Sequence, residues 1–144
     1  PPPPLFFFTQ TTASALAQGL VGSEMGIRDR VICLFGCGGD RDRTKRPRMG
    51  AVAGALADVA VVTSDNPRTE VPMDIINDIL PGLEGTPAEV VVEPDRRAAI
   101  RRALSLARAG DTVVLAGKGH ETYQEVDGVE YHLDEREEIA AYFA

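Results

Sequence analysis

One loop of the sequence combines glycines with basic side chains, a composition suited to binding a small anion. The loop GCGGDRDRTKR, at 36–46, carries Arg41, whose guanidinium can form two parallel hydrogen bonds with a carboxylate or a phosphate. Its G-x-G-G-x-R start resembles half of a dinucleotide-binding fingerprint, but an arginine stands where the third glycine should be. The alternative interpretation is a surface loop whose arginines and aspartates pair with one another.

A second loop, SDNPRTE at 64–70, presents an acid, an amide and a base around a proline. Pro67 fixes its own φ angle and favours an extended Asn66, so Asp65, Asn66 and Arg68 are held in a fixed order. An aspartate and an arginine held in this way could bind an ammonium and a carboxylate group together. The alternative is a turn in which these side chains satisfy only the local backbone.

A third loop, GKGHE at 117–121, offers Glu121 as an acceptor for an amine. It is not a Walker A loop, which requires G-x-x-x-x-G-K followed by Ser or Thr. We interpret His120 as a hydrogen-bond anchor, with a proton carrier as the alternative, and we expect His132 and Cys33 to be structural. Two cysteines four residues apart and two histidines predict neither a disulfide framework nor a zinc site.

These loops occupy equivalent places in a repeated strand and helix pattern. Apolar runs predict strands at 31–35, 59–63, 89–93 and 111–117. Between and after them, the sequence predicts four helices: at 47–57, from Pro72 to just before Pro81, at 96–108, and after the N-cap Asp134. In the helix at 96–108, we expect the arginines, including Arg96, to face solvent. Asp127-Gly128 between alternating runs predicts a β-hairpin over 122–132.

Repeated β-α units predict an α/β fold: a Rossmann-like parallel sheet with flanking helices and an added C-terminal β-hairpin. Ligands bind such sheets beyond the carboxyl ends of the strands, where the three loops meet. Residues 1–29 lack the alternation, so we expect a tail outside the fold, disordered or artefactual, with at most a weak helix over 13–20.

The composition limits the classes of protein to which the chain can belong. Its 144 residues, 44% of them hydrophobic, suffice for one domain with a single core. With 15 Lys and Arg against 22 Asp and Glu, the formal charge is −7, which argues against a nucleic-acid partner. No apolar run reaches the ~18 residues of a membrane span, so we expect no membrane partner and a cytoplasmic location.

Three strings, taken together, resemble the C-terminal domain of the Mur ligases: FGCGGDRDRTKRPRMG, ADVAVVTSDNPRTEVPMDIINDIL and VVLAGKGHETYQ. The resemblance covers residues 30–144 and is strongest to members that add meso-diaminopimelate in peptidoglycan synthesis. It implies a domain that binds the incoming amino acid and closes over a central ATPase domain. It assigns the amino-acid site to Arg41, Asp65, Asn66, Pro67, Arg68, Gly117 and Glu121, with no catalytic residue and no metal ligand.

The resemblance also implies a reaction for the intact enzyme. ATP phosphorylates the γ-carboxylate of D-glutamate in UDP-N-acetylmuramoyl-L-alanyl-D-glutamate, and the amine of diaminopimelate attacks the acyl phosphate. Lysine lacks the far carboxylate of diaminopimelate, so Arg68 favours diaminopimelate as the substrate.

The chain departs from the family in what it lacks. The family domain begins with an earlier strand and helix, and ATP and Mg²⁺ are bound mainly by the central domain; neither feature is recognisable here. We therefore expect a fragment that is inactive alone. The alternative is a stand-alone Rossmann-like module that binds a nucleotide or phosphate through 36–46 without catalysis.

Overall fold

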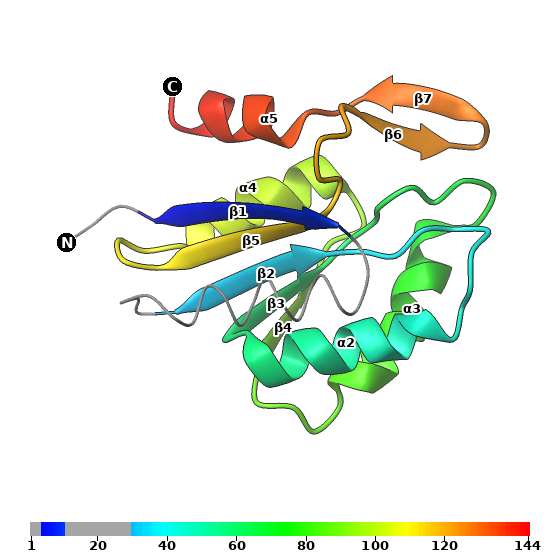
Figure 1. The fold of residues 1–144 in the computed structure, drawn as a ribbon, viewed down its shortest axis with the longest axis horizontal. Coiled ribbons are helices and arrows are strands. Elements are labelled where there is room, and N and C mark those ends of the chain that lie inside the picture. Colours follow the sequence, from blue (N-terminus) through cyan, green and yellow to red (C-terminus); the bar gives the residue numbers. More distant parts are fainter. Residues whose placement is uncertain (1–3, 11–29) are drawn as a thin grey trace.

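The computed structural model describes residues 4–10 and 30–144. Within these residues, five parallel strands form one sheet in the order β1-β5-β2-β3-β4 (Figure 1). The strands are β1 (Leu5–Gln10), β2 (Val31–Phe35), β3 (Val59–Val62), β4 (Glu89–Val92) and β5 (Thr112–Gly117). Parallel pairing brings their carboxyl ends to one edge, as the predicted Rossmann-like architecture requires.

The central strand β2 shows why the sheet is covered on both sides. All five of its residues are buried. Alternate side chains, such as Cys33 and Leu34, enter two separate apolar clusters on opposite faces. The predicted strand at 89–93 forms β4, but it lies at the edge of the sheet with Val90 and Val92 exposed.

Two layers of helices supply these clusters. The helices α2 (Lys45–Leu56) and α3 (Pro72–Leu83) lie on one side of the sheet in Figure 1, and α4 (Arg96–Leu106) and α5 (Glu135–Tyr142) on the other. None of the helices in the described part of the chain is long and apolar enough to cross a membrane.

The helix starts follow the predicted signals, but one helix end does not. Pro72 occupies the first turn of α3, and Asp134 caps α5 through its side chain. The prediction that α3 ends before Pro81 is wrong, since the helix continues to Leu83. Leu83 is buried in the core, and Gly82 lets the backbone approach Pro47 of α2 closely, so packing holds the last turn despite the proline.

The hairpin consists of β6 (Tyr123–Val126) and β7 (Val129–His132), which pair antiparallel. Asp127 and Gly128 have φ angles of 51° and 79°, as a type I′ turn requires. The hairpin contacts the second loop through the backbone: Arg68 N donates to Glu125 O at 3.1 Å, and Asp127 N donates to Arg68 O at 2.8 Å. The hairpin prediction is therefore confirmed, and the hairpin abuts the predicted site.

The structure differs from the expectation of a tail at residues 1–29. Leu5–Gln10 form β1, which pairs in parallel with β5. The edge strand on this side of the sheet is therefore β1, and β5 lies inside the sheet. Phe6 and Phe8 pack against the cluster beneath α4, so burial of aromatic surface favours the strand. The weak helix expected over 13–20 lies outside the described residues.

Arg96 also differs from its prediction, because it is buried and not solvated. It donates to Glu135 Oε2 at 3.1 and 3.0 Å and to the backbone oxygens of Ser64 and Ala116 at 2.8 and 3.0 Å. A guanidinium with this many acceptors can be buried, and the pair joins α4 to α5.

Candidate functional site

The first and second loops contact each other backbone to backbone at the carboxyl edge of the sheet. Gly39 N donates to Asn66 O at 2.8 Å. A Cβ at Gly39 would overlap Pro67 O, and one at Gly36 would overlap Thr63 O. Glycine is therefore needed at both positions, and the close approach fixes the two loops relative to each other.

This contact places three of the predicted site residues around one cavity. Arg41 from the first loop and Asp65 and Arg68 from the second line a cavity of about 360 Å³. The remaining lining residues are Cys37, Gly38, Asp42, Lys45 and Met49. Charges of both signs thus face one space, which suits a zwitterionic ligand.

Neighbouring residues orient the side chain of Arg68 but bind only some of its hydrogen-bond donors. Its backbone has a φ angle of 53°, its Nη1 donates to Gly39 O at 3.0 Å, and its Nε lies 3.5 Å from Glu125 Oε2. Among the described residues, its Nη2 has no hydrogen-bond partner within bonding distance. The guanidinium is therefore oriented by the protein and retains a donor for a ligand.

The third loop reaches the second through a buried lysine. Lys118 Nζ donates to Asn66 Oδ1 and lies 3.2 Å from Asp65 Oδ1 and 3.7 Å from Glu121 Oε2. Asn66 Nδ2 in turn donates to Glu121 Oε2 at 3.5 Å. Burial lowers the pKa of Lys118, and the nearby carboxylate of Asp65 opposes that shift.

Sequence reasoning gave Lys118 no role, although the predicted residues Asp65, Asn66 and Glu121 all contact it. A lysine between two glycines reads as an exposed loop residue, because lysine is rarely buried. Only the meeting of the loops after β3 and β5 shows that its side chain is enclosed.

The predicted site residues Pro67 and Gly117 contribute through the backbone. Pro67 forms the surface against which Gly39 packs. Gly117 ends β5 with a φ angle of 124°, a conformation that other residues rarely adopt, and so turns the chain into the third loop.

A second buried cation, Arg46, connects the first loop to the far end of the second loop. Its Nη1 and Nη2 donate to the two carboxylate oxygens of Glu70 at 3.1 and 2.8 Å, and Nη2 also donates to Gly38 O at 3.1 Å. The hydrogen bond from Arg46, followed by that from the Asp40 backbone, lowers the pKa of Glu70 to about 2. Sequence reasoning missed this ion pair, because both residues lie in charged loops that look solvated.

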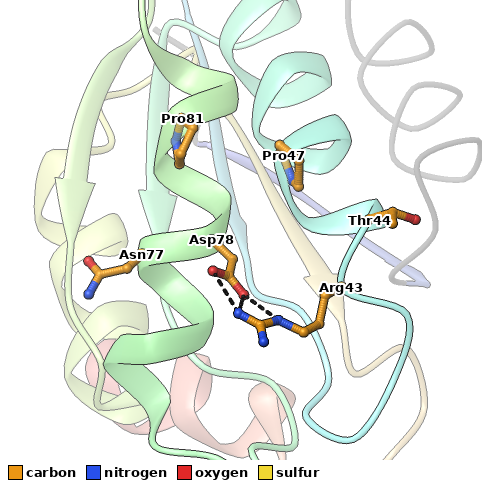
Figure 2. Close-up of a pocket in the computed structure, with 6 residues that line it drawn as sticks. All are labelled: Arg43, Thr44, Pro47, Asn77, Asp78 and Pro81. Carbon is orange, nitrogen blue, oxygen red and sulfur yellow. Dashed lines mark hydrogen bonds and ion pairs between the residues drawn. The ribbon is translucent and has the colours of Figure 1, made fainter.

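Arg46 also donates to Asp78 at 2.8 Å, and Asp78 accepts two hydrogen bonds from Arg43 at 3.1 and 3.3 Å (Figure 2). Arg43 and Arg46 therefore pair with acids of α3 and of the second loop, whereas the alternative interpretation of the first loop pairs its arginines with its own aspartates. Arg41 is different, since its Nη1 donates only to the adjacent Asp40 O within the described residues.

The cavity in Figure 2, of about 320 Å³, lies between α2 and α3. Its charged groups, Arg43 and Asp78, already satisfy each other. The cavity near Arg41 and Arg68 is therefore the better candidate for a ligand.

The cysteines and histidines show no arrangement for chemistry. Cys33 and Cys37 are free and buried, and burial raises the pKa of each thiol to about 12. His120 Nδ1 accepts from Arg136 Nη2 at 3.2 Å, and His132 contacts Glu137 at 2.6 Å. In the described part of the chain, no three His, Cys, Asp or Glu residues group as metal ligands would.

Residues 9–119 match the family described as "Mur ligase, glutamate ligase domain". The chain belongs to the Mur ligase family. The matched range of this Mur ligase chain begins within 1–29 and so includes the end of β1. A non-native origin of residues 1–29 stays a prediction.

Curated relatives of this Mur ligase chain carry the name UDP-N-acetylmuramoyl-L-alanyl-D-glutamate–2,6-diaminopimelate ligase. One from Gloeobacter violaceus is 54% identical over 127 residues, which is 88% of this chain and 26% of the relative. One from Solibacter usitatus is 60% identical over 107 residues, 74% of this chain and 22% of the relative. The chain thus spans about a quarter of the length of these relatives.

A solved structure of a ligase with the same name has a similar fold. It superposes with a TM-score of 0.88 at 41% identity and covers 95% of this chain and 28% of its own. The Rossmann-like fold with its added hairpin and the family resemblance are both confirmed.

Proposed function

We propose that this chain is the amino-acid-binding domain of an ATP-dependent ligase that adds meso-diaminopimelate to UDP-N-acetylmuramoyl-L-alanyl-D-glutamate in peptidoglycan synthesis. The observation that carries the proposal is the grouping of Arg41, Asp65 and Arg68 around one cavity. The relatives and the solved structure that the chain resembles are named as ligases for this amino acid.

The charges around the cavity match the far end of diaminopimelate, which carries one carboxylate and one ammonium group. Among the described residues, Arg68 Nη2 is left without a partner and can bind the carboxylate, and Arg41 lines the same cavity. Asp65 lines the cavity and supplies an acceptor for the ammonium group. Glu121 does not line it, but it lies 3.7 Å from Lys118 Nζ, which is also 3.2 Å from Asp65, and we assign it as a second acceptor. Lysine would leave the arginine donors without a partner.

The contribution of such a domain to the reaction is positioning. Holding the amino acid so that its amine faces an acyl phosphate replaces a bimolecular encounter by a near-attack geometry. ATP and Mg²⁺ supply phosphoryl transfer in this reaction, and we assign their binding to a part of the ligase outside this chain. We also propose that the ligase acts in the cytoplasm. The residues described here show neither a Walker A loop nor a cluster of metal ligands.

Titration of the isotopically labelled chain, followed by amide NMR, tests the proposal. Meso-diaminopimelate should shift the resonances of Arg41, Asp65, Arg68 and Glu121, and L-lysine should shift them only at much higher concentration. The alternative, a nucleotide- or phosphate-binding module, requires shifts at 36–46 with ATP or phosphate and none with diaminopimelate. That result would overturn the proposal.

A further inference from the structure

Lys118 is a fully enclosed charged group where the second and third loops meet. Its side chain is 0% exposed, while the three side chains that meet its Nζ come from two different loops. Asp65 and Asn66 follow β3, and Glu121 follows β5. A buried ammonium is costly unless oxygen atoms surround it, so this lysine and these acceptors depend on one another.

The ammonium also keeps two carboxylates near each other. Asp65 Oδ1 and Glu121 Oε2 lie 3.2 and 3.7 Å from the same Nζ. Without that cation, two negative groups would face each other in a partly desolvated space. Repulsion would then drive the loops apart or favour protonation of one carboxylate, and either change would weaken the binding of an ammonium group.

A further consequence concerns the orientation of the Asn66 amide. Its Oδ1 accepts from Lys118 Nζ and from Glu125 N, the latter at 2.9 Å. Two donors on one end of the amide require the other end, Nδ2, to face Glu121. Lys118 and the Glu125 amide together therefore decide which end of Asn66 is available on the side of the predicted amino-acid site.

Other charged groups near Lys118 cannot take its place. Arg96 lies nearby, but its guanidinium is bonded to Glu135 and to backbone oxygens of Ser64 and Ala116. The ring of Tyr123, with its centroid 6.0 Å from Nζ, offers only a cation-π contact.

We propose that Lys118 is a positioning residue for the amino-acid site: its ammonium holds Asp65, Asn66 and Glu121 in the arrangement that receives the charged end of the substrate. The proposal rests on the proposed function. It assigns Lys118 no contact with the reacting atoms, so removing it should weaken capture of diaminopimelate while the chemical step, once the amino acid is bound, continues.

The test uses a full-length ligase carrying this domain, with steady-state kinetics of Lys118→Met and Lys118→Gln. We expect KM for diaminopimelate to rise about tenfold or more, with kcat and KM for ATP changing less than about threefold, because charge-assisted contacts are lost only at the amino-acid site. Lys118→Gln retains a donor to Asn66 and should be impaired less than Lys118→Met. A folded Lys118→Met enzyme with KM for diaminopimelate within about twofold of the parent would overturn the proposal.

Arg30→Met is the matched control. Arg30 pairs with Asp111 at 3.2 Å, where β2 and β5 begin, at the opposite edge of the sheet. Its loss should lower the melting temperature and leave KM for diaminopimelate unchanged. If Arg30→Met raised that KM as much as Lys118→Met, the effect of Lys118 would be one of general stability, and the proposal would fail.

A measurement without substrate separates this inference from the proposed function. In the parent chain, the Asn66 side-chain NH₂ should give ordered, well-separated NMR resonances that shift and broaden in Lys118→Met or Lys118→Gln. Unchanged resonances would refute positioning by Lys118. A parent ligase that does not use diaminopimelate would refute the proposed function, and the Asn66 resonances would still decide the role of Lys118.

If neither variant folds, the parent provides the readout. The Lys118 NζH₃ resonance should move when diaminopimelate binds, because the ammonium group of the substrate then shares the carboxylates of Asp65 and Glu121 with Lys118. No movement at saturation would overturn the proposal.

Discussion

Arg68 is the residue whose charge should select the amino acid. Replacing it with alanine leaves the far carboxylate of diaminopimelate without its donor in a partly desolvated cavity. Charge-assisted hydrogen bonds of this kind are worth roughly 1.5–3 kcal/mol, so kcat/KM for diaminopimelate should fall about tenfold to a hundredfold. Lysine has no such carboxylate, and its poor use should hardly change.

The measurement is kcat/KM for both amino acids in a full-length ligase carrying this domain, before and after Arg68→Ala. Arg101→Ala, an exposed arginine of α4 remote from the cavity, is the control and should change neither value. An equal loss for both amino acids would show that Arg68 supports its loop, through Gly39 O and Glu125, and does not recognise the substrate.

Gly39 tests whether the contact between the first two loops is required. A methyl group there would overlap the backbone of Pro67, which cannot move as a flexible side chain can. We expect Gly39→Ala to destabilise the chain by about 1–3 kcal/mol, in the range of other overpacking substitutions, and to weaken diaminopimelate binding. Thermal unfolding and the NMR titration measure the two effects, and an unchanged melting temperature would contradict the described contact.

For single residues, the sequence was enough to predict the candidate site residues, but it did not reveal the buried cations that hold their loops together. Arg41, Asp65 and Arg68 could be found because their loops follow predicted strands, and carboxyl-end loops converge in a parallel sheet. Lys118 and Arg46 could not, since burial of a charge depends on oxygen atoms that come from other loops. Whether the predicted residues bind an amino acid stays a prediction.

Among the elements, the contact of the 64–70 loop with α2 should depend on pH through Glu70. Its pKa is lowered from 4.5 to about 2 in the folded chain, mainly by the hydrogen bond from Arg46. A carboxyl group with a depressed folded pKa stabilises the fold fully above pH 4.5, and this stabilisation is lost as the pH falls towards 2.

Glu70→Gln should therefore lower the melting temperature at neutral pH. The difference between parent and variant should shrink as the pH falls from 4.5 towards 2, because the parent then loses its own carboxylate. Melting curves across this range provide the measurement. A difference that stays constant with pH would show that the Glu70 carboxylate is not the stabilising group.

The strand β1 is the element that sequence analysis assigned to a tail, and its removal is a direct test. Phe6 and Phe8 pack against the core, and the ring of Phe6 lies 6.3 Å from that of Phe143. Deleting residues 1–10 should lower the free energy of unfolding by about 2–4 kcal/mol, estimated from two partly buried aromatic side chains. A tail outside the fold would leave the melting temperature unchanged.

The contrast between β1 and β2 explains what could be predicted about the elements. VICLF in β2 is bounded by a loop and followed by a helix signal, so it fits the repeating pattern. LFFF in β1 is followed by only a weak helix signal at 13–20, and its pairing with β5 is what identifies it as a strand. The same holds for the end of α3, where burial of Leu83 outweighs the tendency of Pro81 to end a helix.

At the scale of the whole molecule, the proposed amino-acid site is accompanied by no Walker A loop in the sequence and by no cluster of metal ligands among the described residues. It spans about a quarter of the length of relatives named as 2,6-diaminopimelate ligases. An acyl phosphate must form before the amine can attack, and nothing in the three loops performs that step. Binding of the amino acid and formation of the amide should therefore be separable.

We expect the purified chain to form no amide from ATP, diaminopimelate and the UDP-linked dipeptide. Activity should return when this domain replaces its matching segment in the Gloeobacter violaceus relative, to which it is 54% identical over 127 residues, because the site would then face an acyl phosphate. ADP release that requires diaminopimelate is the measurement, and the same chimera with Arg68→Ala is the control. Amide formation by the chain alone would contradict the assignment of ATP to another domain, and a folded chimera that uses lysine as well as diaminopimelate would contradict the role given to Arg68.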